Sequence, residues 1–274
     1  MSFRVGTRKT EARSRGEAHV AESGSSALSI LRVSEVKYLV TGDLACPGTK
    51  IWYSLNMKLL LTSAGITNET IANALEDLAG KSIKESKILF IPTAANTGTD
   101  DKSWLVQNIY EFTKREPLSF DLIDIAGLPD SMWKKHFEVA DVICFGGGDE
   151  AYLSRILDEQ NITEYLKPLL EKKVYMGISA GSLVAGIFQP KGINVELYGE
   201  ECENDEGIGM EFYDFVFIPH LNSPYFPNVI IETLEEKRDR FVSRVIATDD
   251  FTAIKIVDGE IEFVGDGDRW EKPE

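Results

Sequence analysis

Short apolar runs alternate with amphipathic helical patterns from residue 57 onward, and this alternation restricts the fold more than any other feature of the chain. Five runs rich in Ile, Leu, Val and Phe are typical of buried strands: 58–61, 87–92, 120–125, 141–145 and 174–178. Amphipathic helices are predicted between them, at about 68–78, 102–114, 131–139 and 151–157. This order predicts an α/β fold with a doubly wound, mostly parallel sheet, in which ligands bind at the carboxyl ends of the strands.

Both ends of the chain differ from this middle region. Residues 1–56 carry eight Lys or Arg and five acidic residues, a net charge of +3, whereas the remainder carries −19. They contain no long periodic apolar face, so we expect a disordered, dispensable leader before a single domain at 57–274.

Asp258-Gly259 predicts a hairpin turn. The C-terminal part is rich in strands, predicted at 212–219, 244–247, 252–257 and 261–264.

Charge and cysteine content exclude several classes of protein. With a formal charge of −16 and a pI of about 4.7, the chain lacks the basic surface that binding to nucleic acid or an anionic membrane requires. Cys46, Cys144 and Cys202 are widely spaced and suggest neither a disulfide framework nor a zinc site. No apolar stretch reaches the ~20 residues of a membrane helix, and the N-terminus lacks the apolar centre of a signal peptide. We therefore expect a cytoplasmic protein.

The segment Gly177-Ile178-Ser179-Ala180-Gly181 directly follows the apolar run 174–176. A serine between two glycines in that position predicts a sharp turn from strand to helix, which exposes the serine side chain at the carboxyl end of the strand. Ser179 is therefore the candidate nucleophile. The same pentapeptide also occurs by chance where strands meet helices, so other residues must decide its role.

A serine hydroxyl needs a base to remove its proton, and histidine is the side chain best suited to this near neutral pH. The chain has only three histidines. His19 lies in the leader and His136 on a predicted surface helix, whereas His220 follows the strand-like run 215–219. Elimination favours His220 as the base. A structural histidine near the surface is the alternative.

Acyl transfer also needs hydrogen-bond donors where the oxyanion develops. The backbone amide of Ala180, directly after the candidate nucleophile, is one source. The glycine run 146–148, at the end of the preceding core strand, is the other, because three glycines let the backbone approach a bound carbonyl closely. A tight turn from strand to helix would also explain one or two of these glycines.

Three motifs occur in order along the chain: Phe145-Gly146-Gly147-Gly148-Asp149, Gly177-Ile178-Ser179-Ala180-Gly181-Ser182 and Ile218-Pro219-His220. With them, the chain from about Met57 to the C-terminus resembles the dipeptidase E-like serine peptidases, a group that includes aspartyl dipeptidase and, more distantly, cyanophycinase. The resemblance implies a sheet related to the class I glutamine amidotransferases. It also implies a Ser-His-acid triad and hydrolysis of short peptides without a cofactor or metal.

By motif position, the resemblance implies Ser179 as nucleophile, His220 as base, and the amides of Gly148 and Ala180 as oxyanion donors. The acid of this family lies between the nucleophile and the histidine, where dipeptidase E carries an aspartate. This chain departs from that pattern, because its acids in this interval include Glu196 and a cluster: Glu200, Glu201, Glu203, Asp205 and Glu206.

Glu196 is the favoured acid, because the alternation in 193–198 predicts a short strand that would hold its carboxylate on the polar face. An exposed strand glutamate with no catalytic role would show the same pattern. The cluster at 200–206 is more typical of a solvated loop. Asp249 and Asp250, before the predicted strand at 252–257, are the reserve candidates.

The predicted activity is hydrolysis of dipeptides or short peptides near a terminus through an acyl-enzyme. One alternative is an esterase of the α/β-hydrolase type. That class places the acid before a histidine near the C-terminus, and no histidine follows His220 in this chain. Another is a catalytically silent binding module on an amidotransferase-like scaffold. Preference for an N-terminal aspartate would need a cation. No arginine matches the family position in 228–233, and Lys237, Arg238 and Arg240 beyond it suit a solvated helix face, so no aspartyl preference is predicted.

Overall fold

The computed structural model describes two strands near the N-terminus and, beyond them, residues 57–99, 101–188, 192–199 and 209–273. The chain divides into two compact units, Met1–Trp52 and Tyr53–Glu274. In the first, β1 (Ser29–Val33) pairs antiparallel with β2 (Val36–Val40), an element that the sequence did not lead us to expect. The rest of the predicted leader lies outside the described residues, so its disorder stays a prediction.

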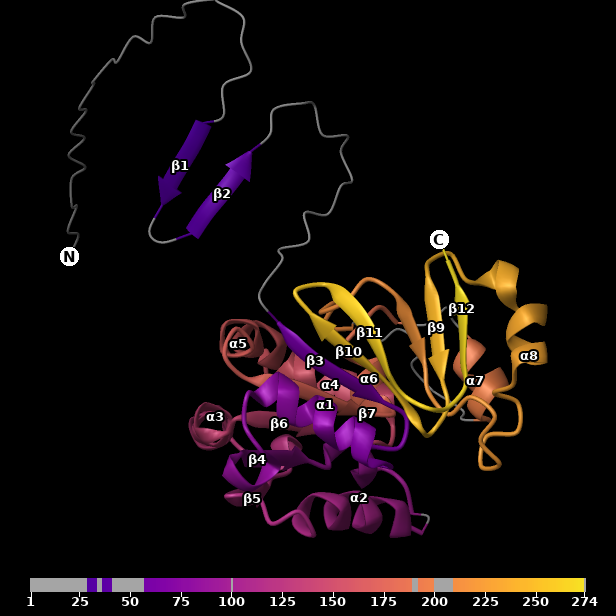
Figure 1. Ribbon diagram of the computed structural model, residues 1–274, viewed down its shortest axis with the longest axis horizontal. Helices are drawn as coiled ribbons and strands as arrows, with labels where there is room; N and C mark the ends of the chain where they lie inside the picture. Colours follow the sequence, from indigo (N-terminus) through magenta and orange to yellow (C-terminus); the bar gives the residue numbers. More distant parts are fainter. Residues whose placement is uncertain are drawn as a thin grey trace, which may run out of the picture. The chain divides into compact units, whose positions relative to one another are not determined.

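A seven-stranded sheet forms the centre of the second unit (Figure 1). Its strands are β3 (Lys58–Thr62), β4 (Lys87–Ile91), β5 (Ser119–Leu122), β6 (Val142–Phe145), β7 (Val174–Ile178), β10 (Thr252–Val257) and β11 (Glu260–Gly265). They lie in the order β11-β10-β3-β7-β6-β4-β5. The last five strands in this order, which are β3, β7, β6, β4 and β5, run parallel. The predicted α/β fold with a mostly parallel sheet is confirmed.

The antiparallel edge of this sheet contains the predicted hairpin. β10 pairs with both β3 and β11, and Val257 lies opposite Glu260 in the register of the last two strands. Between them, Asp258 and Gly259 have φ angles of 53° and 85°. Two positive φ angles are what a two-residue turn needs to match the twist of its strands, so the turn chemistry fixes this register.

Helices cover both faces of the sheet. They are α1 (Glu69–Ala79), α2 (Ser103–Thr113), α3 (Asp130–Val139), α4 (Glu150–Glu159) and α5 (Ile162–Leu169). In β6, Val142 and Cys144 point toward the core shared with α1 and α2, whereas Ile143 and Phe145 point toward the core shared with α3, α4 and α5. Burial on both faces explains why β6 and β7 are continuously apolar in sequence. The prediction of a buried strand at 120–125 is wrong in this respect, because β5 lies at the edge of the sheet and is partly exposed. We had not predicted α5.

A smaller sheet of order β12-β9-β8 adjoins this layer and, with β10 and β11 of the large sheet, forms the strand-rich C-terminal part (Figure 1). Its strands are β8 (Val216–Ile218), β9 (Val245–Thr248) and β12 (Arg269–Lys272). β8 and β9 run parallel, with Ile218 opposite Ala247, and β12 is antiparallel to β9. Because parallel strands end at the same edge, the residues that follow β8 and β9 come close together.

The prediction of a short strand at 193–198 is wrong, because these residues form helix α7 (Ile193–Tyr198). The glycines on either side, Gly192 and Gly199, both have left-handed φ angles of 78° and 72°. The helix buries Ile193, Asn194 and Leu197, whereas the alternation in the sequence predicted burial of every second residue. A spacing of four between Ile193 and Leu197 is the helical signal that the alternation concealed.

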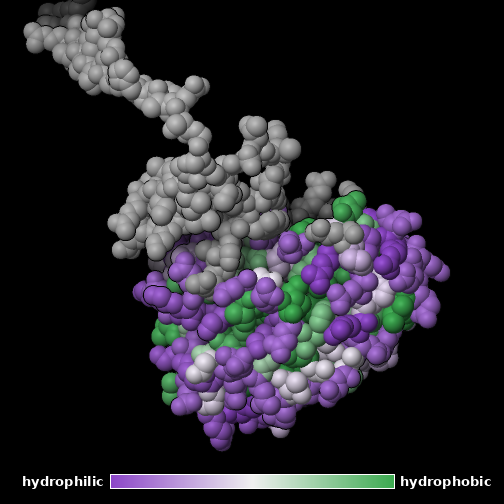
Figure 2. All heavy atoms as spheres, turned by 45° about the horizontal axis from the view of Figure 1, so that its top comes forward, coloured by the Kyte–Doolittle hydropathy of each residue, from purple (hydrophilic) through white to green (hydrophobic). Residues whose placement is uncertain are grey.

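The surface of the second unit is mainly polar. Figure 2 shows hydrophilic side chains over most of the face in view, with hydrophobic patches between them. None of the helices in the described residues is long and apolar enough to cross a membrane. Nor do the described side chains bring together three or more His, Cys, Asp or Glu residues in a group that could hold a metal ion. Of the three cysteines, Cys144 is buried in β6, and the other two lie outside the described residues.

Gly181 packs against the end of β6 without room for a side chain, because a Cβ there would lie 2.0 Å from the carbonyl oxygen of Phe145. We expect Gly181→Ala to lower the free energy of unfolding by about 3 kcal/mol, since one of the two backbones must move. Urea unfolding followed by circular dichroism measures the change. Gly127→Ala is the control, because nothing lies within 4 Å of its added Cβ. Equal unfolding midpoints for the two variants would contradict this packing.

Candidate active site

Ser179 occupies the turn between β7 and the short helix α6 (Ala180–Leu183), as the glycine-flanked motif predicted. Its backbone has φ 49° and ψ −112°, which is rare for a residue with a side chain. The turn is tied to β3, because the Ser179 amide donates a 2.9 Å hydrogen bond to the carbonyl oxygen of Thr62. A glycine is needed at 177, where a Cβ would lie 2.6 Å from the backbone of Ser182.

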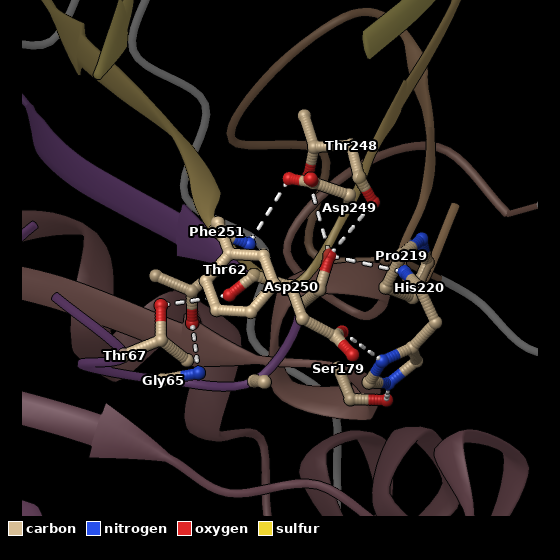
Figure 3. Close-up of polar contacts among 12 residues, drawn as sticks. Thr62, Gly65, Thr67, Ser179, Pro219, His220, Thr248, Asp249, Asp250 and Phe251 are labelled. Atoms are coloured by element: carbon tan, nitrogen blue, oxygen red, sulfur yellow. Dashed lines mark hydrogen bonds and ion pairs between the residues drawn. The ribbon is translucent and has the colours of Figure 1, made fainter. Parts of the chain in front are cut away.

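The His220 imidazole lies next to Ser179 (Figure 3). Its Nε2 is 3.0 Å from Ser179 Oγ, although the two residues are 41 positions apart. His220 follows β8 by two residues and has a left-handed φ of 68°. The ring of Phe226 stacks on the imidazole with their centroids 4.5 Å apart, which restrains the ring from the side. The two side chains that the sequence selected are therefore in hydrogen-bond contact.

Asp250 completes a chain of hydrogen bonds, with its Oδ1 2.7 Å from His220 Nδ1 (Figure 3). Burial raises the pKa of this carboxyl, but the hydrogen bond from His220 and the charge of that ring outweigh burial, so the pKa lies below its ordinary value of 3.8. The carboxylate is therefore ionised at neutral pH. Its ionised form stabilises the fold above pH 3.8, and this contribution is lost as the pH falls through the lowered pKa.

Glu196, the acid that the sequence favoured, does not contact His220 and requires a correction. It lies on α7, where its carboxylate pairs with Lys237 and is 2.6 Å from Arg240 Nη1. Those two cations lower the pKa of the Glu196 carboxyl, mainly through hydrogen bonds from Lys237 and then Arg240. Asp250, one of the two reserve candidates, occupies the position beside the imidazole.

The other candidate acids have different places. Asp249 accepts backbone hydrogen bonds from Phe251 and Asp268, at 3.0 and 2.8 Å, and so organises the loop that presents Asp250. The acidic cluster from Glu200 to Glu206 lies outside the described residues. Position in the fold is the signal that identifies Asp250, because it follows β9 by two residues, as His220 follows β8.

The glycine run after β6 lies beside Ser179. A Cβ on Gly147 would be 3.3 Å from Ser179 Cβ and 3.5 Å from the exposed ring of Trp104. Gly148 has φ 130°, and a Cβ there would lie 2.2 Å from the carbonyl oxygen of Ala94. Within the described residues, neither the Gly148 amide nor the Ala180 amide donates a hydrogen bond to a protein acceptor.

The other two histidines lie elsewhere. His136 is on α3, and its Nδ1 is 2.5 Å from Asp121 Oδ2 on β5. His19 lies outside the described residues. Among the histidines that the structure describes, His220 alone contacts a serine hydroxyl with one ring nitrogen and a carboxylate with the other.

The three cations considered for an acidic substrate, Lys237, Arg238 and Arg240, form ion pairs with carboxylates. Lys237 and Arg240 both pair with Glu196, and Arg238 pairs with Glu235 at 2.8 Å. These pairs fit the prediction that this segment is a solvated surface. Helix α8 (Ile231–Glu236) ends before the three cations, which the sequence had placed on the same helix.

A family model described as peptidase family S51 matches residues 59–264. The chain belongs to peptidase family S51. The match covers nearly the whole second unit, so the predicted resemblance to dipeptidase E-like peptidases is confirmed. By family, the S51 chain is a serine peptidase.

Two solved structures share the fold of this S51 chain. A provisionally named peptidase E protein from Listeria monocytogenes EGD-e has a TM-score of 0.63 and 16% identity, over 77% of this chain and 99% of that chain. A peptidase from an acI-B1 actinobacterium has a TM-score of 0.59 and 20% identity, over 80% of this chain and 96% of that one. The expected relation to the class I glutamine amidotransferase-like fold is confirmed. No curated protein matches the chain.

Proposed function

We propose that this S51 peptidase hydrolyses dipeptides or short peptides near a free terminus through an acyl-enzyme on Ser179. The observation that carries the proposal is the line of hydrogen bonds from Ser179 Oγ through His220 to Asp250, with distances of 3.0 and 2.7 Å. A hydroxyl, an imidazole and a carboxylate in this order can activate a serine for attack on a carbonyl carbon. The turn that holds Ser179 has the character of a nucleophile elbow.

In the proposed mechanism, His220 Nε2 removes the proton from Ser179 Oγ as the oxygen attacks the peptide carbonyl. The imidazolium then protonates the leaving amine, and water attacks the resulting ester with His220 again as base. Asp250 accepts the hydrogen bond from Nδ1–H, which keeps the unprotonated nitrogen directed at Ser179 and stabilises the imidazolium. The lowered pKa of Asp250 supports this role, because the carboxylate stays ionised throughout.

The amides of Gly148 and Ala180 are proposed as the oxyanion donors. Both belong to segments beside Ser179. Ala180 directly follows Ser179 in the chain, and Gly148 directly follows Gly147, where an added Cβ would lie 3.3 Å from Ser179 Cβ. Both N–H groups lack acceptors among the described residues and are therefore available to a substrate oxygen. Each such donor is worth about 2.7–4 kcal/mol in the transition state of acyl transfer.

The proposal for small peptides rests on the family and on the walls of the site. Trp104 lies next to Gly147, and Phe226 stacks on His220, so one aromatic ring borders the glycine run and another borders the proposed base. The cations Lys237 and Arg240 pair with Glu196, so the proposal assigns no preference for or against an acidic side chain next to the scissile bond.

The order of the site residues argues against an α/β-hydrolase esterase. In that class the acid precedes the histidine in the chain, whereas here Asp250 follows His220 by 30 residues. A purified-protein screen against a dipeptide and short-peptide library, run beside simple esters, should therefore show peptide hydrolysis at the higher kcat/KM. Ester turnover without any peptide turnover would refute the proposed activity.

A catalytically silent binding module is the second alternative, and covalent labelling separates it from an enzyme. We expect a fluorophosphonate to label Ser179 stoichiometrically, because only an activated serine displaces the leaving group from phosphorus. Intact-mass spectrometry gives the stoichiometry, and peptide mapping gives the position. Full-length protein without a single bound phosphonyl group after prolonged exposure would favour the silent module.

A further inference from the structure

The carboxyl end of β3 touches both halves of the proposed site. Thr62 holds the turn of Ser179, because its carbonyl oxygen accepts the Ser179 amide at 2.9 Å and its Oγ1 donates to the carbonyl of Gly177 at 2.7 Å. Ser182 adds a second tie, since its Oγ lies 3.0 Å from the Thr62 nitrogen and 2.8 Å from the Thr62 oxygen. The nucleophile turn is thus fixed to this strand end.

Ser63, the next residue, contacts the other half. Its Oγ accepts the His220 backbone N–H at 3.0 Å and lies 3.0 Å from the carbonyl oxygen of Thr248, to which it can donate. The same Oγ is 3.2 Å from Thr248 Oγ1. The serine is 1% exposed, so no water replaces these partners without a rearrangement. Thr248 ends β9 and precedes Asp250 by two residues.

We propose that Ser63 is a positioning residue that fixes the His220 imidazole between Ser179 and Asp250, an inference that rests on the proposed function. His220 has a φ of 68°, a left-handed conformation that is unfavourable for a residue with a side chain, so its surroundings must hold it there. The stacked ring of Phe226 and the Asp250 carboxylate restrain the imidazole, whereas the Ser63 hydroxyl restrains the backbone from which it projects.

One buried hydroxyl therefore joins the two loops that carry the base and the acid. Its acceptor function is used by His220 and its donor function by the end of β9, and its backbone is continuous with the strand end that holds Ser179. Ser63 acts on the reaction through His220, because its hydrogen bonds go to the groups of His220 and Thr248. Loss of the hydroxyl leaves the His220 N–H without its acceptor and frees the loop to shift.

The test compares Ser63→Ala with Ser63→Thr, which keeps a hydroxyl. A third variant, Ser63→Cys, keeps a side chain of similar size, but its thiol forms only weak hydrogen bonds. We expect kcat to fall about 10- to 100-fold in Ser63→Ala with KM changed less than about twofold, because a small displacement of a base lowers the rate of the chemical step. The rate constant for fluorophosphonate labelling should fall in parallel. Ser63→Thr should recover most of both, and Ser63→Cys should lie between.

Ser86→Ala is the matched control, because Ser86 is also 1% exposed and its hydroxyl donates to a backbone carbonyl, that of Ser82, at 2.9 Å. It should lower stability similarly without changing kcat or labelling. Equal activity of Ser63→Ala and wild type, or equal losses in Ser63→Ala and Ser86→Ala, would overturn the inference.

Histidine-selective NMR makes the result independent of catalysis. The Nδ1–H of His220 should exchange with solvent at least several-fold faster in Ser63→Ala than in wild type. If the fluorophosphonate does not label the wild-type protein, only the proposed function is refuted. The NMR comparison still decides the role of Ser63. An unchanged exchange rate in Ser63→Ala would overturn it.

Discussion

Ser179→Ala is expected to reduce kcat for the peptide selected by the library screen by several orders of magnitude, up to about 10⁶-fold. Without Oγ there is no nucleophile, whereas the proposed oxyanion donors, the Gly148 and Ala180 amides, are unchanged, so we expect KM to change little. Initial rates at saturating substrate measure the effect. Full peptidase turnover in this variant would exclude the acyl-enzyme mechanism.

Ser182→Ala provides the contrast within the same turn. The Ser182 hydroxyl is fully buried and bonds both backbone groups of Thr62, so its loss should appear in stability, by about 1–3 kcal/mol. Ser179→Ala removes a half-buried hydroxyl whose partner is a side chain, so its unfolding midpoint should remain near that of wild type. Loss of activity in Ser179→Ala with wild-type stability therefore separates chemistry from folding.

The central sheet and two residues of the candidate site, Ser179 and His220, were predictable from local sequence. β7 and β10 have the bounds that their apolar runs predicted. β7 is buried along its whole length, and such a strand tolerates few polar residues. Ser179 and His220 were found because each directly follows such a run. A side chain at the carboxyl end of a strand is identified by the strand itself, without knowledge of distant contacts.

The acid was not predictable in the same way. Its position depends on the parallel pairing of β8 with β9, two short strands separated by α8 and more than twenty residues of chain. Nothing local in the sequence reveals which strand pairs with which. The family pattern directed attention to the interval before His220, and the alternation around Glu196 there was produced by a six-residue helix, α7.

Asp250→Asn is expected to lower kcat by about 10⁴-fold with little change in the overall fold. The asparagine side chain can donate a hydrogen bond to Nδ1, which favours the tautomer with the proton on Nε2. That nitrogen then cannot accept the Ser179 proton. The loss should appear in kcat and in the rate of fluorophosphonate labelling alike, because both reactions need the activated oxygen.

Glu196→Gln is the matched control, because it makes the same carboxylate-to-amide change on an acid that pairs with Lys237 and Arg240. We expect it to keep kcat within about twofold of wild type, since exposed ion pairs contribute little and this one does not reach the imidazole. The opposite pattern, with Glu196→Gln inactive and Asp250→Asn active, would return the acid to α7. It would also require His220 to turn away from the carboxylate that it contacts at 2.7 Å. The pair of variants therefore tests whether the parallel ends of β8 and β9, and not the interval between nucleophile and base, supply the acid of this S51 chain.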